Sequence, residues 1–321
     1  MIDLIVPVYR PDEKLEQLIE KINKQTKRPD HVLFMQTMTG TKEDERVRSI
    51  LEKAENARII PVKKEEFDHG GTRNLGASLS EAEFMLFMTQ DAVPGDETVV
   101  ERLWTALESD GQTAVAFGRQ LPGEGAGEIE CYTRQFNYPE TSIVKDKGEL
   151  ERLGIKTYFC SNVCAMYRKS VYEELGGFVT QTIFNEDMIF AASVIQAGYR
   201  IAYVADAAVV HSHKYSYWQQ LTRNFDLAVS QRQYREIFEG VKSESEGVRL
   251  VKQTAKHLLK KGKWYLLPDL VFQSGFKFIG YKLGMKYEKL PMGLVRKLSM
   301  NKNYWKERGS CGAGSHRSGD V

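Results

Sequence analysis

The sequence lacks several features that define whole classes of protein. It has 4 cysteines in 321 residues, without the dense spacing of a small disulfide-stabilised secreted domain. No stretch approaches the roughly 18 uncharged apolar residues of a membrane-spanning helix. The first residues, MIDLIVPV, predict a strand and not a signal peptide. We therefore expect a cytoplasmic protein with reduced thiols that is not integral to a membrane.

Positive and negative residues nearly balance over the whole chain, but they are unevenly distributed along it. Residues 251–310 hold 14 Lys and Arg against 3 Asp and Glu, whereas residues 1–250 hold 30 against 39. The basic segment is also rich in aromatic residues, which suits an anionic membrane surface or nucleic acid. The acidic first 250 residues make nucleic acid the less favoured partner. A solvated helical face and a homo-oligomer surface are the alternatives.

The first half of the chain alternates apolar strands with amphipathic helices. Strands are expected at residues 2–8, 31–36, 58–62 and 84–88, and helices at about 11–22, 42–55 and 71–81. Short links between these elements predict a parallel, doubly wound sheet. Ligands of such sheets bind beyond the carboxyl ends of the strands. That rule gathers Tyr9, Gln36, the region of His69 and Asp91 around one crevice.

The segment FDHGGTRNLGA, residues 67–77, places two glycines before a helix. Gly70 and Gly71 would let the backbone approach a ligand and leave free amides at the positive end of the helix. Arg73 lies in the first turn, where a cation opposes the helix dipole unless an anion is nearby. This favours a phosphate site, with a plain glycine-rich turn as the alternative.

A second cluster occupies residues 176–213, GGFVTQTIFNEDMIFAASVIQAGYRIAYVADAAVVHSH. Glu186 and Asp187 begin a helix, where helix capping is an alternative explanation for two acids. A strand at residues 200–204 leads to Asp206. His211 and His213 follow, on one side of the chain if it stays extended.

Together these segments resemble the nucleotide-sugar-dependent glycosyltransferases of family 2, which have a GT-A fold. The order is Pro-Val-Tyr after a strand, Arg-Asn-x-Gly, an acid after a buried strand, Gly-Gly-Phe, Glu-Asp and His, over about residues 1–216. The segments HGGTRN, TQDAVP, GRQLP, RQFNYPETS and HSHKYS are similar to the bacterial rhamnosyltransferases of cell-surface polysaccharide synthesis. The resemblance implies an α/β, Rossmann-like fold with a mixed, mainly parallel sheet flanked by helices.

The resemblance also implies a division of the chain. A nucleotide-sugar half is expected at about residues 1–118 and an acceptor half at about 119–216. Residues 217–310 are expected to form a helical, basic and aromatic region at a membrane surface or in an oligomer interface. Residues 311–321 read as a flexible tail.

A divalent metal, Mg²⁺ or Mn²⁺, is implied on the diphosphate of the donor. The family places an Asp-x-Asp after the buried strand, and the matching positions here are Thr89, Gln90 and Asp91, so the first acid is absent. Asp91 and His211 are the implied ligands, with His213 as the alternative histidine. A single carboxylate predicts a site that forms fully only when the sugar nucleotide binds.

The second acid of the Glu-Asp pair, Asp187, matches the general base of an inverting transfer, with Glu186 as its neighbour or substitute. Further donor contacts are expected at Pro7, Tyr9, Gln36, His69, Gly70, Gly71, Arg73, Asn74 and Gln90. Sugar or acceptor contacts are expected at Arg119, Gln120, Ser161, Asn162 and His213.

The implied donor is dTDP-rhamnose, with a UDP-sugar as the alternative. The implied acceptor is a saccharide or a polyprenyl-diphosphate-linked saccharide, which would keep the protein peripheral at the inner face of the cell membrane. Two other hypotheses differ in kind. One is a non-catalytic carbohydrate- or lipid-surface-binding protein on the same fold. The other is a structural zinc site made by Cys160, Cys164, His211 and His213.

Overall fold

The structure, a computed structural model, describes residues 1–239 and 244–305. Two compact units divide the chain. The first comprises Met1–Thr182, Glu186–Lys214 and Glu236–Leu267, and the second comprises Ile183–Asn185, Tyr215–Arg235 and the segment from Pro268 onwards. The division into donor and acceptor halves stays a prediction.

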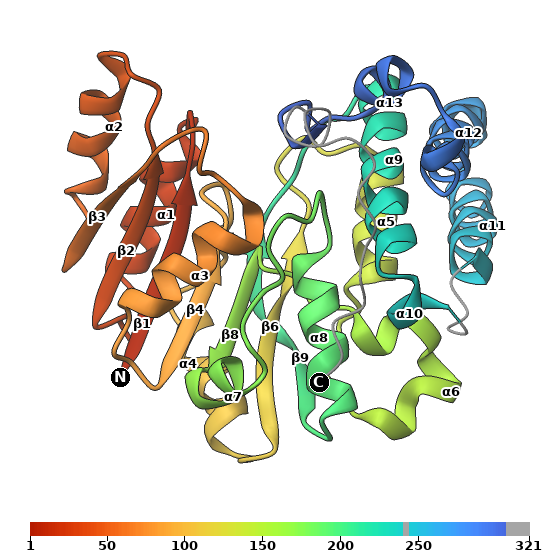
Figure 1. Cartoon of the computed structure of the whole chain (residues 1–321). Helices are drawn as coiled ribbons and strands as arrows, with labels where there is room; N and C mark the ends of the chain where they lie inside the picture. Colours follow the sequence, from red (N-terminus) through yellow and green to blue (C-terminus); the bar gives the residue numbers. More distant parts are fainter. Residues whose placement is uncertain (240–243, 306–321) are drawn as a thin grey trace. The chain divides into compact units, whose positions relative to one another are not determined.

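The first unit is built on one mixed sheet (Figure 1). Its strands are β1 (Ile2–Val8), β2 (His31–Thr37), β3 (Ala57–Val62), β4 (Phe84–Met88), β5 (Val93–Pro94), β6 (Thr113–Leu121), β7 (Ile143–Lys145), β8 (Cys164–Arg168) and β9 (Arg200–Val210). They lie in the order β3-β2-β1-β4-β8-β6-β9-β5, and β7 pairs with β9. The first four strands are parallel, as are β6 and β9, whereas β8 is antiparallel to β4 and β6. The predicted mixed, mainly parallel sheet is confirmed.

The strand order reverses direction at one place. After β1 the chain adds β2 and β3 on one side and then returns to add β4 on the other side of β1. The connections therefore leave the carboxyl ends of β1 and β4 in opposite directions. This is the switch point at which open α/β sheets bind their ligands.

Helices flank this sheet, and α1 shows why they form where they do. The helices of the first unit are α1 (Lys14–Asn23), α2 (Glu43–Leu51), α3 (His69–Leu79), α4 (Val99–Glu108), α5 (Glu128–Asn137), α6 (Leu150–Leu153), α7 (Lys169–Glu174), α8 (Glu186–Gln196) and α11 (Glu244–Lys260), with 3₁₀ turns η1 (Lys147–Glu149), η2 (Gly154–Tyr158) and η3 (Trp264–Leu266). The apolar side chains of α1, Leu15, Leu18, Ile19 and Ile22, recur at helical spacing and are all buried.

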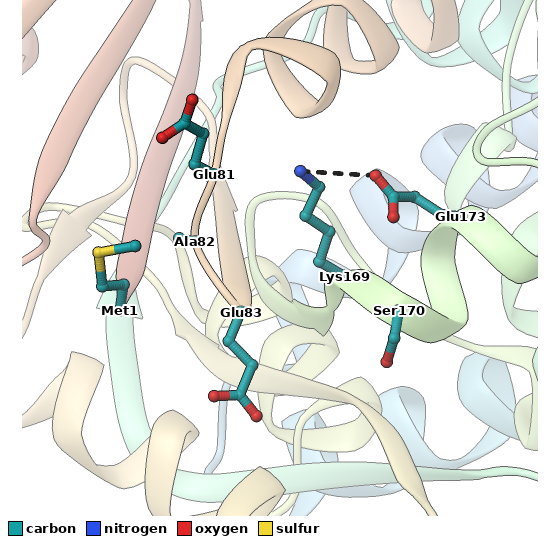
Figure 2. A pocket seen from close by; sticks show the side chains of 7 residues that line it. All are labelled: Met1, Glu81, Ala82, Glu83, Lys169, Ser170 and Glu173. Atoms are coloured by element: carbon teal, nitrogen blue, oxygen red, sulfur yellow. Dashed lines mark ion pairs between the residues drawn. The ribbon is translucent and has the colours of Figure 1, made fainter.

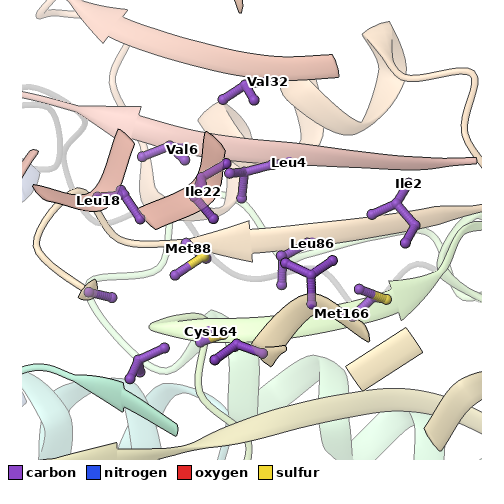
Figure 3. Close-up of a cluster of buried hydrophobic side chains, with 14 of the residues drawn as sticks. Ile2, Leu4, Val6, Leu18, Ile22, Val32, Leu86, Met88, Cys164 and Met166 are labelled. Carbon is purple, nitrogen blue, oxygen red and sulfur yellow. The ribbon is translucent and has the colours of Figure 1, made fainter. Parts of the chain in front are cut away.

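The core lies on both faces of the sheet, and β4 contributes to each. Every residue of β4 is buried. Leu86 and Met88 pack with residues of β1 and α1 on one face, as Figure 3 shows. Met85 and Phe87 point to the other face because side chains alternate along a strand. The predicted burial of this strand on both faces is confirmed.

Helix α11 is fixed to α5 by one acid. The carboxylate of Glu128 accepts hydrogen bonds from His257 Nε2 at 2.7 Å, from Lys261 Nζ at 2.8 Å and from Lys263 Nζ at 2.5 Å. These contacts lower the pKa of Glu128 to about 2. Part of the basic charge noted in the sequence is therefore used inside the first unit.

The α-helices described from residue 217 onwards agree with the expected helical region, but α11 belongs to the first unit. The second unit is itself helical. It contains α9 (Tyr217–Gln233), most of α12 (Leu267–Gly284), η4 (Tyr287–Lys289) and α13 (Met292–Leu298), and α10 (Arg235–Phe238) spans the boundary. Gly280 and Gly284 let α12 pack directly on α9. A Cβ at Gly280 would lie 2.1 Å from the carbonyl oxygen of Leu221, and one at Gly284 would lie 2.3 Å from that of Phe225.

None of the helices in the described part of the chain is both long enough and apolar enough to cross a membrane. The predicted flexible tail, residues 311–321, lies outside the described residues.

Candidate active site

The carboxyl ends of β1 and β4 are joined by one side chain. Gln90 Oε1 accepts a hydrogen bond from the amide of Tyr9 at 2.8 Å, and Gln90 Nε2 donates to the carbonyl of Tyr9 at 3.0 Å. Pro7 lies two residues earlier, in β1, opposite Met35 of β2. The side chain of Gln90 therefore links the ends of β1 and β4 at the switch point. The donor contacts expected of Pro7, Tyr9 and Gln90 stay predictions.

Three metal-ligating side chains meet beside this junction. Asp91 follows β4, and His211 and His213 follow β9. Asp91 Oδ2 lies 3.5 Å from His211 Nε2 and 3.1 Å from His213 Nε2, and the two Nε2 atoms are 3.0 Å apart. The amide of His211 donates to Leu121 O at 3.0 Å, which continues the pairing of β6 with β9 and fixes where the histidines begin.

Gln120 of β6 orients His211. His211 Nδ1 lies 3.1 Å from Gln120 Oε1, an oxygen that also accepts a hydrogen bond from Arg134. An amide oxygen only accepts, so Nδ1 carries a proton, and Nε2 is the ring atom that faces Asp91. Such a partner fixes the tautomer and direction of a metal-ligating histidine. Gln120 was expected to contact a sugar, and Arg134 carried no expected role because isolated polar residues on a helix have no recognisable period.

The charges at this cluster keep Asp91 ionised. Burial opposes the charge of Asp91, but the hydrogen bond and charge of His211 and the charge of His213 outweigh it and hold the pKa of Asp91 well below its usual range. An ionised carboxylate beside two imidazoles is a donor set that fits a divalent metal ion.

The zinc hypothesis is wrong. Cys160 and Cys164 are buried, and burial raises the pKa of each thiol to about 12. A zinc-bound cysteine is a thiolate, so these neutral thiols suit packing and not ligation. Within residues 1–239 and 244–305, the one group of metal-ligating side chains is Asp91, His211 and His213, without either cysteine.

Glu186 and Asp187 occupy the first turn of α8 but make different contacts. Glu186 Oε1 lies 3.1 Å from Arg73 Nη1, and both side chains are buried. Asp187 Oδ1 accepts from the amide of Met188 at 2.8 Å, and Asp187 Oδ2 accepts from the amide of Asn162 at 3.2 Å. The arrangement differs from simple helix capping, because Glu186 is held by a cation from α3.

These contacts give the two acids opposite pKa shifts. Burial would raise the pKa of Glu186, but the charges of Arg73 and His69 outweigh it and lower this pKa. For Asp187, burial and the neighbouring charge of Glu186 raise the pKa to about 7. A carboxylate with a pKa near neutrality is well matched to accept a proton at physiological pH.

The metal-ligand cluster and the acid pair are connected. Gln120, which orients His211, donates from Nε2 to Ser161 Oγ at 3.0 Å. The next residue, Asn162, holds Asp187 through its amide and lies 3.4 Å from Glu186 Oε1 through Nδ2. Asn162 Oδ1 in turn accepts from Tyr167 OH of β8 at 2.7 Å. One network thus includes side chains from most of the segments singled out in the sequence.

The glycines expected before a helix lie instead in the first turn of α3, which begins at His69. The amide of Gly71 donates to Asp68 Oδ1 at 2.7 Å, so it is not free for a ligand. A Cβ at Gly70 would lie 2.0 Å from the carbonyl oxygen of Val179, so this glycine is needed for packing of the backbone. The anion beside Arg73 is Glu186, not a phosphate. The prediction that the amide of Gly71 is free was wrong because Asp68 caps it, whereas the donor contacts expected of this segment stay predictions.

Three other expected contact residues are engaged within the protein. Asn74 binds the backbone of Phe178, accepting from its amide at 3.0 Å and donating to its carbonyl at 2.8 Å. Gln36 is buried and donates to the carbonyl of Asp44 at 2.8 Å. Arg119 pairs with Glu140 at 3.1 Å. Their roles toward donor or acceptor stay predictions, and internal hydrogen bonding accounts for each of them.

A surface pocket lies at the opposite edge of the sheet. Figure 2 shows its lining residues, Met1, Glu81, Ala82, Glu83, Lys169, Ser170 and Glu173. Met1 and Glu83 directly precede β1 and β4, so this pocket is at the amino ends of the strands. Its three acids face one lysine, which already pairs with Glu173 at 3.5 Å. Such a lining disfavours an anionic nucleotide.

The fold and the site together define a glycosyltransferase of the GT-A type. Residues 3–176 match the family described as glycosyl transferase family 2, and the chain belongs to this family. The chain is 40% identical to the O-antigen chain rhamnosyltransferase RfbN of Salmonella typhimurium, over 95% of this chain and 96% of that protein. It is 38% identical to the O-antigen chain rhamnosyltransferase WbaN of Salmonella anatum, over 94% and 95%. The predicted enzyme class is confirmed, and the non-catalytic alternative is set aside.

Solved structures share the fold at low identity. S. aureus TarS 1–349 in complex with UDP-GlcNAc has a TM-score of 0.55 and 15% identity, covering 90% of this chain and 91% of that one. The mannosyltransferase PcManGT of Pyrobaculum calidifontis, in complex with GDP-Man and Mn²⁺, has a TM-score of 0.56, covering 96% and 86%, with 16% identity. At this identity, the likeness supports the fold alone.

Proposed function

We propose that this glycosyltransferase moves rhamnose from dTDP-rhamnose onto a saccharide acceptor in the synthesis of a cell-surface polysaccharide. The observation that carries the proposal is 40% identity with an O-antigen chain rhamnosyltransferase over 95% of this chain. The acceptor is a saccharide or a lipid-linked saccharide. A UDP-sugar donor is the second candidate, favoured only by a distant fold neighbour that binds UDP-GlcNAc.

In the proposed reaction, Asp187 removes the proton of the attacking acceptor hydroxyl. The hydroxyl would otherwise be a poor nucleophile, and a positioned base contributes roughly 10²–10⁴-fold to the rate. The amides of Asn162 and Met188 hold both oxygens of Asp187. Glu186 and Arg73 act through Asp187 and do not touch the acceptor themselves in this proposal. The charge of Glu186 helps to raise the pKa of Asp187 to about 7. A base opposite the leaving group gives direct displacement with inversion.

Asp91 and His211 would hold the divalent ion, Mg²⁺ or Mn²⁺, that this donor set fits. When bound, such an ion neutralises the negative charge that develops on the diphosphate leaving group. Gln120 keeps Nε2 of His211 directed toward Asp91, where a bound ion would take the place of its proton. Gln120 also donates to Ser161, and the next residue, Asn162, holds Asp187, so neighbouring residues of one segment support the metal ligands and the base.

A panel of donors tests the sugar and the nucleotide. The full chain is incubated with dTDP-rhamnose, UDP-GlcNAc and GDP-mannose, each with Mn²⁺, Mg²⁺ or chelator, and thermal stabilisation and donor hydrolysis are measured. Stabilisation and hydrolysis with dTDP-rhamnose alone are expected. A preference for UDP-GlcNAc would move the proposal to the second candidate, and indifference to all three donors would overturn it.

The base is tested by Asp187→Asn. Asparagine keeps the shape and an oxygen for the amide of Asn162 but cannot take a proton. Turnover is expected to fall by at least about 10²-fold while donor stabilisation persists. Unchanged turnover would reject Asp187 as the base.

We also propose that α12 of the second unit contacts an anionic membrane surface, where a lipid-linked acceptor would lie. Val271, Phe272, Phe278 and Ile279 recur at helical spacing and are 48–66% exposed. Gly280 and Gly284 occupy the side that packs on α9, so the apolar side chains lie on the face left exposed. Basic residues follow in the same segment, Lys282, Lys286 and Lys289, and each contributes about 1 kcal/mol near an anionic surface.

Vesicle sedimentation tests this surface. The full chain is expected to bind phosphatidylglycerol vesicles and not phosphatidylcholine vesicles, with binding lost in high salt or in the double variant Phe272→Ser, Phe278→Ser. Because both side chains are exposed, this variant should fold normally. Absence of vesicle binding, or a dimer in solution that the same variant disrupts, would reject the membrane proposal.

A further inference from the structure

His213 is as close to Asp91 as His211 is. The three ligand atoms, Asp91 Oδ2, His211 Nε2 and His213 Nε2, are separated by 3.0, 3.1 and 3.5 Å. Two ligands at right angles on an ion with bonds of about 2.1 Å lie about 3 Å apart. The three atoms therefore match one triangular face of an octahedron, which leaves the opposite face for oxygens of a substrate or water.

The loop between the histidines is fixed, so this convergence is built into the fold. The carbonyl of Ser212 accepts from Lys14 Nζ at 3.2 Å, and its hydroxyl donates to Glu130. The two imidazole planes stand at 89° with centroids 4.6 Å apart, so the rings meet edge to face, and their Nε2 atoms lie 3.0 Å from one another.

The sequence explains what a second histidine contributes. Thr89 occupies the position of the first acid in the Asp-x-Asp pattern and supplies no carboxylate. Asp91 and His211 alone would leave a pair of protein ligands. The imidazole of His213 supplies a third ligand atom without adding negative charge.

We propose that His213 is the third protein ligand of the metal, in place of the acid absent at Thr89, and that the resulting set of two imidazoles and one carboxylate selects Mn²⁺ over Mg²⁺. The inference rests on the proposed metal-dependent transfer. Imidazole nitrogen suits transition-metal ions, whereas Mg²⁺ takes oxygen ligands and gives up its waters reluctantly. Both histidines are used, so they are partners and not alternatives.

Spin-echo EPR of Mn²⁺ bound to the full chain, alone and with dTDP, tests the ligand set. The wild-type protein should show nitrogen couplings from two imidazoles, and His213→Gln should show one. Since loss of an outer partner already costs about 10–100-fold in metal affinity, His213→Gln should weaken Mn²⁺ binding at least tenfold. The matched control is His31→Gln, a partly exposed histidine that begins β2 at the amino edge of the sheet; it should change neither measurement.

A reciprocal variant tests the exchange of acid for histidine. Adding Thr89→Asp to the His213→Gln variant should restore Mn²⁺ affinity. The double variant should also show a smaller preference for Mn²⁺ over Mg²⁺ than the wild type in a competition titration. Four results would each overturn the inference. The wild-type protein could show coupling from one nitrogen only, or bind no Mn²⁺ with or without dTDP. His213→Gln could keep its Mn²⁺ affinity, or the wild-type protein could bind Mn²⁺ and Mg²⁺ equally well. Two-nitrogen couplings in a protein that ignores every sugar nucleotide would reject the proposed function alone.

Discussion

Replacing Glu186 by Gln removes a buried negative charge next to the proposed base. Burial and the charge of Glu186 together raise the pKa of Asp187 to about 7. Glutamine keeps an oxygen for Arg73 and Asn162 but carries no charge. Arg73 lowers the pKa of Asp187 in both proteins, so the loss of the Glu186 charge decides the sign, and the pKa of Asp187 should fall.

The size of this shift follows from the interaction of two like charges. Such a charge shifts a pKa when it lies within about 6 Å, and at that separation and an effective dielectric constant of about 20 the interaction is about 3 kcal/mol. One pKa unit corresponds to about 1.4 kcal/mol, so the shift is up to about 2 units. Burial still disfavours the charge in the variant, which keeps the pKa of Asp187 above that of a solvated aspartate.

The assay is the pH dependence of kcat/KM for rhamnosyl transfer at saturating metal, between about pH 5 and about pH 9. A base must be ionised to act, so wild-type activity should fall as the pH drops through about 7. Glu186→Gln should hold its rate to a pH lower by one to two units. Glu83→Gln, which changes an exposed carboxylate at the other edge of the sheet, serves as control. An acidic limb that stays in place or moves upward in folded Glu186→Gln would refute the reasoning.

Three further predictions concern the metal site and the second unit. Gln120→Ala frees the imidazole of His211 to rotate and should lower Mn²⁺ affinity by about 10–100-fold in a titration; unchanged affinity would contradict the orienting role. Burial raises the pKa of Asp226 to about 6. Between about pH 4 and about pH 6, Asp226 is protonated in the folded chain and ionised in the unfolded chain. The wild-type protein therefore loses stability as the pH rises through this range, because the buried carboxyl must ionise. Asparagine does not titrate, so the free energy of unfolding of Asp226→Asn, measured relative to that of the wild type, should rise by up to about 3 kcal/mol over that pH range. A difference that stays constant with pH in urea titrations would refute this. Gly280→Ala should destabilise the second unit by at least about 1 kcal/mol because its Cβ would meet the backbone of α9. The control is Gly275→Ala in the same helix, whose Cβ meets nothing within 4 Å and which should stabilise the unit by up to about 1 kcal/mol. Equal effects of the two variants in thermal unfolding would show that α12 does not pack as described.

Much of the fold was predictable because it is local. The continuous apolar run at residues 84–88 identifies a strand buried on both faces, and the helical spacing of Leu15, Leu18, Ile19 and Ile22 identifies the buried side of α1. Element ends were less accurate. Helix α2 ends at Leu51 and not near residue 55, because the last turn of a helix depends on contacts beyond its own sequence.

The site was predictable in composition but not in its connections. Asp91, Asp187 and His211 follow strands or begin helices, and the order of such segments is visible along the chain. The partner of Arg73 was not, since Glu186 is more than a hundred residues away and pairs with it only through the packing of α3 near α8. The same is true of Gln120, which was expected to meet a sugar and instead orients His211.

The sequence by itself determined the alternation of strands and helices, the family, and the identity of the acids and histidines proposed to carry the chemistry, because these depend on residue type and short-range order. Only the tertiary structure decided which of them interact. It occupied the amide of Gly71 with Asp68, gave Glu186 and Asp187 opposite pKa shifts, and brought His213 beside Asp91. Distances between side chains and the burial of charges depend on segments far apart in the chain, and no local pattern encodes them.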